Sequence, residues 1–175
     1  SSSSRGLGDV YKRQLYLKPE DKVLDIGCGW GGFAKFASER YGCHVTGISI
    51  ADTQIEYARG FCTGLPVEIV KSDYRDHRGE YDKILCCGMI EAVGYKNYRP
   101  FMEVAHRNLK DDGLFLLHTI ARHDSGLATD PWIDKYIFRN GQLPSAMQLS
   151  EAAEDLFPLN DWHNFGADAQ PTLVS

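Results

Sequence analysis

The feature that most constrains this chain is residues 23–32, where an apolar run reaches an acidic residue and then enters a glycine-rich turn. Glycine lacks a Cβ, so glycines at alternate positions let the backbone turn sharply and let a ligand approach the main chain. Phe33, Phe36, Ala37 and Tyr41 follow at helical spacing, and the first turn of a helix offers unpaired amide donors. The segment therefore predicts a strand, a loop and a helix that together bind a nucleotide-like ligand.

The spacing of the glycines separates two classes of cofactor. A dinucleotide site has G-x-G-x-x-G and an acidic residue about 20 positions later for the ribose. Here the spacing is G-x-G-x-G-G, and the next expected strand, Cys43 to Ile48, is followed by Ser49 and not by a carboxylate. Asp25 at the end of the first strand suits an S-adenosylmethionine site. The sequence favours S-adenosylmethionine over NAD, and a strand-to-helix turn without a ligand is the alternative.

Composition limits the class of protein. The 175 residues are 43% hydrophobic and 25% charged, which is typical of one folded domain. A net charge of −5 argues against a nucleic-acid surface. No apolar run reaches the roughly 18 residues of a membrane span, and no secretory signal is present. The five cysteines contain no C-x-x-C pair. We therefore expect a cytoplasmic protein with reduced thiols and no metal site.

Residues 1–14 are excluded from the expected fold. The segment is polar and lacks periodicity, and its last six residues, Asp9 to Gln14, are encoded by the reading frame GAT GTG TAT AAG AGA CAG. That DNA resembles a transposon end used in sequencing libraries. We expect 1–14 to be an adapter artefact, with a natural disordered tail as the alternative, and 15–175 to be a partial methyltransferase domain from a longer gene.

Strands and helices alternate after Leu15. The expected strands are Val23–Ile26, Cys43–Ile48, Val67–Lys71, Tyr81–Cys87 and Leu114–Ile120; the expected helices are Phe33–Tyr41, Ala51–Phe61 and Tyr98–Leu109, the last ended by residues 111–113. This alternation predicts an α/β fold with a mostly parallel sheet and helices on both faces. The fifth strand is apolar throughout, which predicts burial on both faces.

A long insertion follows the fifth strand. Residues 121–150 include the aromatic-rich segment 130–138, and a short helix is expected near 149–156. An insertion at the carboxyl end of a central strand lies over the ligand crevice of an open α/β sheet. The segment is placed to cover a substrate, and a surface loop that buries its own aromatic residues is an equal alternative.

Two polar residues lie at neighbouring strand ends. Glu91 follows the fourth strand, and His118 lies inside the fifth. A charged group in an apolar run costs stability unless it is paired or hydrated. A carboxylate and an imidazole at this edge could hold a small anion or transfer a proton, whereas a hydrogen-bonded core histidine would explain His118 equally well.

Several segments together resemble one family. Residues 23–36, 44–50, 88–98, 115–120, 130–138 and 161–166 are similar to the cyclopropane-fatty-acyl-phospholipid synthases and, more distantly, to the mycolic acid cyclopropane synthases. The resemblance covers essentially all of residues 15–174. It implies a Rossmann-like class I methyltransferase fold. It also implies that the cis double bond of a phospholipid acyl chain attacks the methyl group of S-adenosylmethionine, and that bicarbonate removes the proton as the cyclopropane ring closes.

The resemblance also implies the site residues. Glu91, His118 and the backbone of Ile120 match the bicarbonate positions of the family. The expected cofactor residues are Asp25, Gly27, Cys28, Gly29, Gly31, Ser49, Ile50, Gln54, Asp73 and Tyr74. The implied partners are phospholipid acyl chains at the inner face of the cytoplasmic membrane, where the protein would be peripheral. A homodimer is compatible with the resemblance.

This chain also departs from the family pattern. Ala92 stands where many members have a histidine, and the segments that supply a cysteine and a tyrosine to the bicarbonate site lie outside the sequence. In this fold the final strand lies between the fifth strand and a sixth strand, which is expected at Phe157–Phe165. The chain is expected to stop before that final strand. It is therefore expected to be poorly soluble and inactive alone. A methyltransferase of a small non-lipid substrate and a non-catalytic cofactor-binding module are the alternatives.

Overall fold

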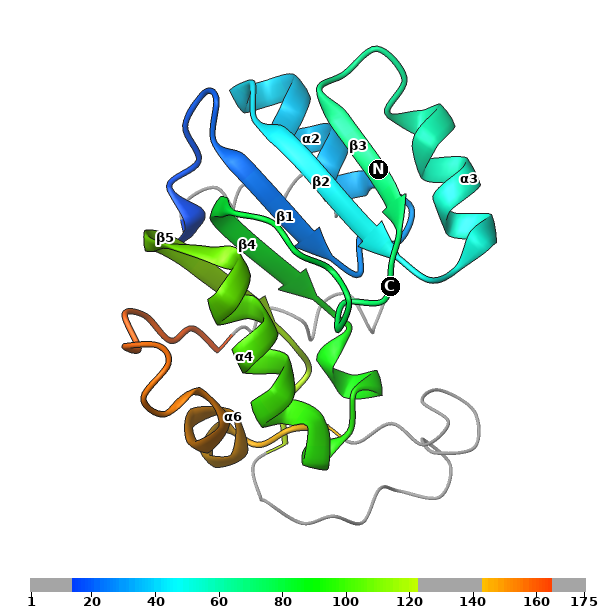
Figure 1. The fold of residues 1–175 in the computed structure, drawn as a ribbon. Helices are drawn as coiled ribbons and strands as arrows, with labels where there is room; N and C mark the ends of the chain where they lie inside the picture. Colours follow the sequence, from blue (N-terminus) through cyan, green and yellow to red (C-terminus); the bar gives the residue numbers. More distant parts are fainter. Residues whose placement is uncertain (1–13, 123–142, 165–175) are drawn as a thin grey trace, which may run out of the picture.

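The computed structural model describes residues 14–122 and 143–164 (Figure 1). Within these ranges the strands are β1 (Lys22–Ile26), β2 (His44–Ser49), β3 (Val67–Lys71), β4 (Tyr81–Cys87) and β5 (Leu109–His118). The helices are α2 (Gly32–Tyr41), α3 (Asp52–Phe61), α4 (Tyr98–Asn108) and α6 (Ala146–Ala153), with two 3₁₀ turns, η1 (Ile90–Ala92) and η2 (Tyr95–Asn97).

The strands form one parallel sheet in the order β3-β2-β1-β4-β5. The chain runs outward from β1 to β3 and then crosses back to place β4 on the other side of β1. In open α/β sheets, ligands bind outside the carboxyl ends of the strands at such a switch point. A ligand site is therefore expected outside the carboxyl ends of β1 and β4.

Helices cover both faces of the sheet, as Figure 1 shows. Alternate side chains of a strand point to opposite faces. Leu24 and Ile84 pack with Phe101 of α4 and Leu149 of α6. On the other face, Val23, Val45 and Leu85 pack with Ala34 and Ala37 of α2, and Ile69 packs with Ile55 and Ala58 of α3. The packing on both faces of the sheet fixes the positions of the strand ends.

Most expected elements are confirmed within a residue or two, but the fifth strand differs from the prediction. Residues 111–113 lie within β5 as an irregular stretch of its pairing with β4, so they do not end the preceding helix, which stops at Asn108. The side chains of Leu114–His118 are only half-buried, because β5 is the edge strand among the described residues. His118 is the last residue of the strand, and Ile120 follows it.

The prediction of a sixth strand at Phe157–Phe165 is wrong for the residues of this range that the structure describes. Residues 157–164 contain no strand. Phe157 instead packs its ring against Phe115 of β5 at 5.3 Å and His106 of α4 at 5.5 Å, measured between centroids. Pro158, the next residue, has no backbone N–H to give to a neighbouring strand. Phe165 lies outside the described residues.

The short helix after the insertion is confirmed as α6, which begins with a capping box between Ser145 and Gln148. The aromatic-rich segment 130–138 lies outside the described residues. In the described ranges, 14–122 and 143–164, no helix is both long and apolar enough to cross a bilayer.

Candidate active site at the carboxyl ends of the strands

The glycine-rich loop after β1 is held in left-handed backbone conformations. Gly27, Gly29 and Gly31 have φ values of 79°, 53° and 80°. A Cβ at Gly31 would lie 3.0 Å from that of Ala58, so this glycine is required by packing against α3. A Cβ at Gly29 would meet no atom within 4 Å. Gly29 therefore opens onto free space, as a loop that admits a ligand requires.

Asp25 and Cys28 lie beneath this loop. Asp25 is buried, and its burial raises the pKa of the carboxyl to about 7. Cys28 is also buried, and a Cβ at Gly47 would lie 2.9 Å from that of Cys28. Burial raises the pKa of the Cys28 thiol to about 12. The side chain of Cys28 therefore supports the loop from below, and only its backbone takes part in the loop surface.

The end of β2 and the first turn of α3 supply three of the predicted cofactor residues. Ser49 Oγ accepts a hydrogen bond from the backbone N–H of Ala51 at 3.2 Å and lies 3.5 Å from Gln54 Oε1. The side chain of Ile50 is exposed. Gly27 N and Cys28 N both donate to Ile48 O, at 3.0 and 3.1 Å. These two bonds join the glycine loop to the end of β2, so the predicted residues of both segments lie together.

Asp73 and Tyr74 follow β3. The side chain of Arg75 donates to both carboxylate oxygens of Asp73, at 2.9 and 2.5 Å, and these bonds hold the pKa of Asp73 down to about 2. The ring of Tyr74 packs edge-on against Phe101 of α4 at 5.4 Å. Backbone N–H of Ser72 donates to Ser49 O at 3.0 Å, which brings this turn beside the end of β2.

Glu91 lies in the turn η1 after β4, and its carboxylate is almost completely buried, with 2% of the residue exposed. Oε1 accepts a hydrogen bond from the backbone N–H of Ile120 at 2.9 Å. Oε2 is buried and has no hydrogen-bond partner among the described residues. An unsatisfied buried carboxylate oxygen is costly, so it indicates a place for a donor.

His118 ends β5 on the same edge of the sheet. Its backbone oxygen accepts from Gly88 N at 3.0 Å, and its Nδ1 lies 3.5 Å from Cys87 Sγ. Glu91 and Ile120 are thus in direct contact, and His118 is two residues from Ile120. The predicted trio of Glu91, His118 and Ile120 lies together where β4 and β5 end.

The buried thiol of Cys86 lies near Asp25 in the glycine-loop half of the site and near Glu91 in the other half. Cys86 on β4 is completely buried, and its burial, with the nearby carboxylates of Asp25 and Glu91, raises the pKa of its thiol well above the usual value. The carboxyl groups of Asp25 and Glu91 therefore both lie near Cys86.

Sequence reasoning missed two residues of this region. Met89 covers Gly27, because a Cβ at Gly27 would lie 3.1 Å from the Met89 side chain. Cys87 contacts His118 across two strands. Neither residue belongs to a spacing pattern, and only the pairing of β4 with β5 places Cys87 beside His118.

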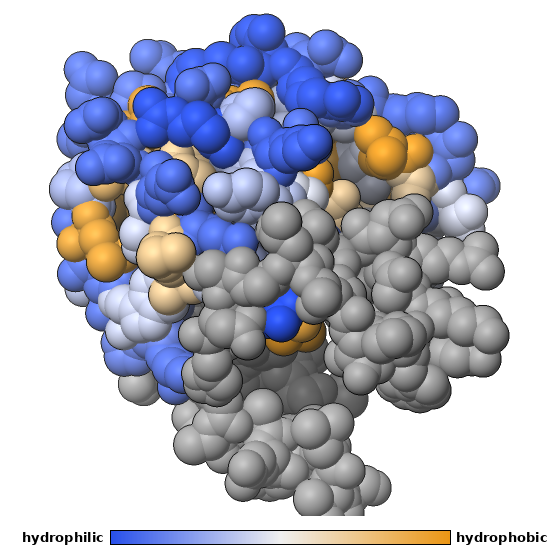
Figure 2. All heavy atoms as spheres, turned by 90° about the horizontal axis from the view of Figure 1, so that it is seen from below, coloured by the Kyte–Doolittle hydropathy of each residue, from blue (hydrophilic) through white to orange (hydrophobic). Residues whose placement is uncertain are grey.

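Figure 2 shows this end of the molecule from below, where hydrophilic side chains cover most of the described surface and hydrophobic ones form small separate patches.

Comparison with proteins of known sequence gives a consistent result. A family model described as mycolic acid cyclopropane synthetase matches residues 8–175. The chain is 49% identical over 162 residues to the cyclopropane-fatty-acyl-phospholipid synthase of Escherichia coli K12, a match that covers 93% of this chain and 42% of that protein. It is 31% identical to the S-adenosylmethionine-dependent methyltransferase UmaA of Mycobacterium tuberculosis, a match that covers 91% of this chain and 59% of that protein. The chain therefore spans less than half the length of the curated synthase.

The comparison with solved structures leads to the same family. The mycolic acid cyclopropane synthase CmaA1, complexed with SAH and CTAB, superposes with a TM-score of 0.80 at 28% identity, over 90% of this chain and 61% of that one. The cyclopropane synthase MmaA2 of M. tuberculosis gives a TM-score of 0.81 at 26% identity over the same shares. The expected Rossmann-like class I methyltransferase fold is thereby confirmed, and the chain belongs to the mycolic acid cyclopropane synthetase family.

Proposed function

We propose that the protein at full length transfers the methyl carbon of S-adenosylmethionine to the cis double bond of an unsaturated phospholipid acyl chain and forms a cyclopropane ring. The observation that supports this most directly is the buried Glu91, whose free oxygen lies at the ends of β4 and β5 beside a glycine loop open to a ligand.

The residues after β1, β2 and β3 fit S-adenosylmethionine. The free space at Gly29 admits a ligand against the backbone, and a cationic sulfonium group bound nearby would favour the ionised form of the buried Asp25. Ser49 and Gln54 offer polar atoms where a dinucleotide enzyme has its ribose carboxylate. Relatives support this assignment, because CmaA1 was solved with SAH. Asp73 and Tyr74 would lie on the adenine side.

The Glu91 region fits bicarbonate, provided that the anion donates its own proton to the carboxylate. Glu91 Oε2 is a buried acceptor with no partner among the described residues, and the hydroxyl of bicarbonate is a donor. The N–H of Ile120 already donates to Glu91 Oε1, so in this structure it serves to position the carboxylate. The His118 imidazole lies on the same edge and would contact the other side of the anion.

The chemistry follows from these positions. When bound, S-adenosylmethionine supplies an electrophilic methyl group and bicarbonate supplies a base. The π electrons of the acyl double bond form a bond to the methyl carbon, and the sulfur keeps the electrons of the broken bond. The new methyl carbon then loses a proton, and its C–H electrons close the ring. Glu91 and His118 would hold the proton acceptor beside this carbon.

The lipid substrate also suggests where the protein works. Because the acyl chain lies inside a bilayer, we propose a peripheral protein at the inner face of the cytoplasmic membrane. A homodimer would be compatible with this placement.

Two measurements on the full-length protein test the proposal. Calorimetry should show binding of S-adenosylmethionine and none of NAD. Incubation with vesicles of unsaturated phospholipid should then give cyclopropane acyl chains, detected by mass spectrometry as a gain of one CH₂ with loss of the double bond. Methylation of a small amine or hydroxyl compound with no lipid product would support the alternative methyltransferase, and cofactor binding with no turnover would support a binding module.

A further inference from the structure

Asp25 is a buried acid directly before the glycine loop, two residues from Gly27 on β1, and it is 3% exposed. Its partners in the sheet, Gly47 of β2 and Leu85 of β4, carry no charge, and the buried residues of α2 are small and uncharged. Within 14–122 and 143–164, Asp25 makes no ion pair and no side-chain hydrogen bond. A buried carboxylate without a partner is costly, so the protonated form is favoured while no cation lies beside it.

The titratable groups around Asp25 give it no positive charge either. They are the thiols of Cys28 in the loop, Cys62 just after α3 and Cys86 of β4. Burial raises the pKa of each thiol, so all three are neutral near pH 7. The remaining charged group on this side is Glu91, which lies near Cys86 and is itself an acid. A bound ligand would therefore have to supply the missing cation.

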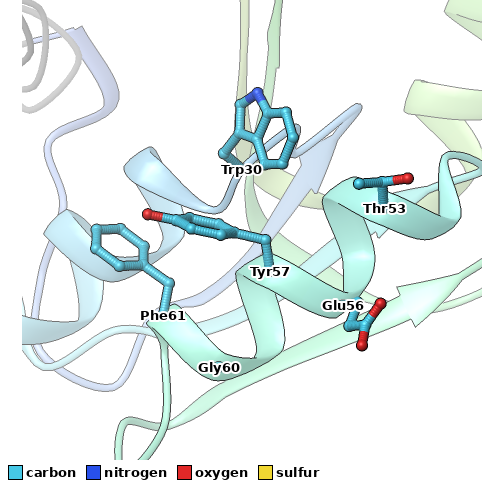
Figure 3. A pocket seen from close by; sticks show the side chains of 6 residues that line it. All are labelled: Trp30, Thr53, Glu56, Tyr57, Gly60 and Phe61. Atoms are coloured by element: carbon cyan, nitrogen blue, oxygen red, sulfur yellow. The ribbon is translucent and has the colours of Figure 1, made fainter.

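A second acid near the loop, Glu56, lies on the outer side of α3. It lines a shallow hollow of about 520 Å³ together with Trp30, the residue after Gly29. Figure 3 shows the Glu56 carboxylate pointing away from the Trp30 ring. Glu56 is exposed, so solvent and salt screen its charge. Asp25, and not Glu56, is thus the acid beneath the loop.

The proposed reaction decides which part of the cofactor meets Asp25. The methyl group must face the acyl chain and the base, which the proposed function places at the ends of β4 and β5. The sulfur then lies on the β4 side of the glycine loop, between Asp25 and Glu91. Both carboxyl groups lie near Cys86, at this same end of β4. The sulfonium charge is therefore the cation that Asp25 lacks.

We propose that Asp25 distinguishes S-adenosylmethionine from S-adenosylhomocysteine by exchanging its proton for the sulfonium charge. The inference rests on the proposed function. When the sulfonium binds, Asp25 releases its proton to solvent and becomes the counterion. Methyl transfer turns the sulfonium into a neutral thioether, so the carboxylate loses its partner and takes a proton back from solvent. The product is then held without the charge pair that holds the substrate, which favours its release.

Calorimetry on the full-length protein between about pH 6 and pH 7.5 tests this inference. The range stays below about pH 8, where α-amino groups such as that of the cofactor titrate. Burial raises the pKa of Asp25 to about 7, so binding that releases this proton should tighten about eightfold from pH 6 to pH 7.5. Affinity for S-adenosylhomocysteine should change by less than about twofold. A constant ratio of the two affinities would overturn the proposal.

The number of protons released measures the exchange in the unmodified protein. Titrations at about pH 6.5 in buffers of different ionisation enthalpy should show about 0.8 proton released for each S-adenosylmethionine bound. Binding of S-adenosylhomocysteine should release almost none. Equal release by both ligands would mean that Asp25 meets the ammonium group that they share, and this result would also overturn the proposal.

Asp25→Asn should remove the pH dependence, because the amide keeps the size of the carboxyl group and has no proton to release. Its affinity for S-adenosylmethionine should stay within about twofold across the range. Glu56→Gln is the matched control, since it removes the same charge near the loop, and it should keep the eightfold change. A pH dependence that persists in Asp25→Asn would assign the proton to another group and contradict the inference.

The same titrations separate this inference from the proposed function. If the unmodified protein bound no S-adenosylmethionine at any pH, the proposed function would be wrong. If it bound both ligands and formed cyclopropane lipid, but with the same pH dependence for both, only the role of Asp25 in telling them apart would be wrong.

Discussion

The two halves of the candidate site are built in different ways. The half at the ends of β1, β2 and β3 depends mainly on backbone: three left-handed glycines and two hydrogen bonds from the loop to Ile48 O. The half at the ends of β4 and β5 depends on side chains. There Glu91 accepts from Ile120 N, and Cys87 lies against His118.

This difference separates binding from chemistry. A backbone loop presents fixed shape and fixed dipoles to a ligand, and only a change of residue size or conformation disturbs it. Side chains at the other half offer acceptors whose protonation and orientation matter for proton removal. We therefore expect changes in the first half to affect cofactor affinity and changes in the second half to affect turnover.

The largest effect is expected for Gly29→Val. The added side chain would fill the free space next to the loop, and the left-handed φ of 53° is unfavourable for a branched residue. Affinity for S-adenosylhomocysteine should fall by more than about 100-fold, measured by calorimetry on the full-length protein. Gly64→Val is the matched control, because Gly64 has a φ of 82° and equally open surroundings but lies after α3. If both variants lost affinity equally, backbone strain and not ligand space would be the cause.

Glu91→Gln should have the next largest effect, on turnover alone. The amide keeps an oxygen that accepts from Ile120 N, so the local fold is preserved, but the second acceptor oxygen becomes a donor. We expect cyclopropane formation to fall about 100-fold, a typical loss for a group that holds a proton acceptor. Affinity for S-adenosylhomocysteine should change by less than about twofold.

Glu103→Gln, an exposed position on α4, should leave both quantities unchanged. Unchanged cyclopropane formation in Glu91→Gln at controlled bicarbonate would remove this carboxylate from the mechanism. A parallel loss of cofactor affinity would instead break the division between the two halves.

The same division explains what could be predicted from the sequence. The glycine loop was predictable because its conformation is encoded within ten consecutive residues. Glu91 and His118 were found as charged or polar residues in apolar surroundings, but the bond between Glu91 and Ile120 joins residues 29 apart and depends on the pairing of β4 with β5. The apolar run 114–117 did not show that β5 would be an edge strand among the described residues, because burial depends on neighbours that periodicity does not identify. The contact between the rings of Tyr57 and Phe61 on α3 follows from their i,i+4 spacing on an expected helix.

Asp25→Asn should change the pH dependence of stability. Burial raises the pKa of Asp25 to about 7 from 3.8, so the folded protein binds a proton that the unfolded chain has released. The stabilisation is complete below about pH 4 and is lost as the pH rises to about 7. The buried ionised form costs about 4 kcal/mol at most. Asp25→Asn should therefore be more stable than the unmodified protein by about 2 to 4 kcal/mol at pH 8 and similar at pH 4.

Urea unfolding of both proteins across this range measures the difference. Asp112→Asn, an exposed position in β5, is the control and should follow the unmodified protein at every pH. Parallel stability curves for Asp25→Asn and the unmodified protein would show that this carboxyl does not titrate on folding.

The smallest effect is expected for Cys87, which we treat as a positioning residue for His118. Its Sγ lies 3.5 Å from His118 Nδ1, and a partner on one ring nitrogen of a histidine fixes the proton and orientation of the other. Cys87→Ala should lower turnover about threefold and raise the KM for bicarbonate, with no change in affinity for S-adenosylhomocysteine. Cys87→Ser keeps a hydroxyl at this place and should recover most of the loss. Nitrogen chemical shifts of the His118 ring should show a changed tautomer balance in the alanine variant and not in the serine variant. A threefold loss with an unchanged tautomer balance would mean that Cys87 acts only through packing, and His118 would then owe its orientation to other contacts at the end of β5.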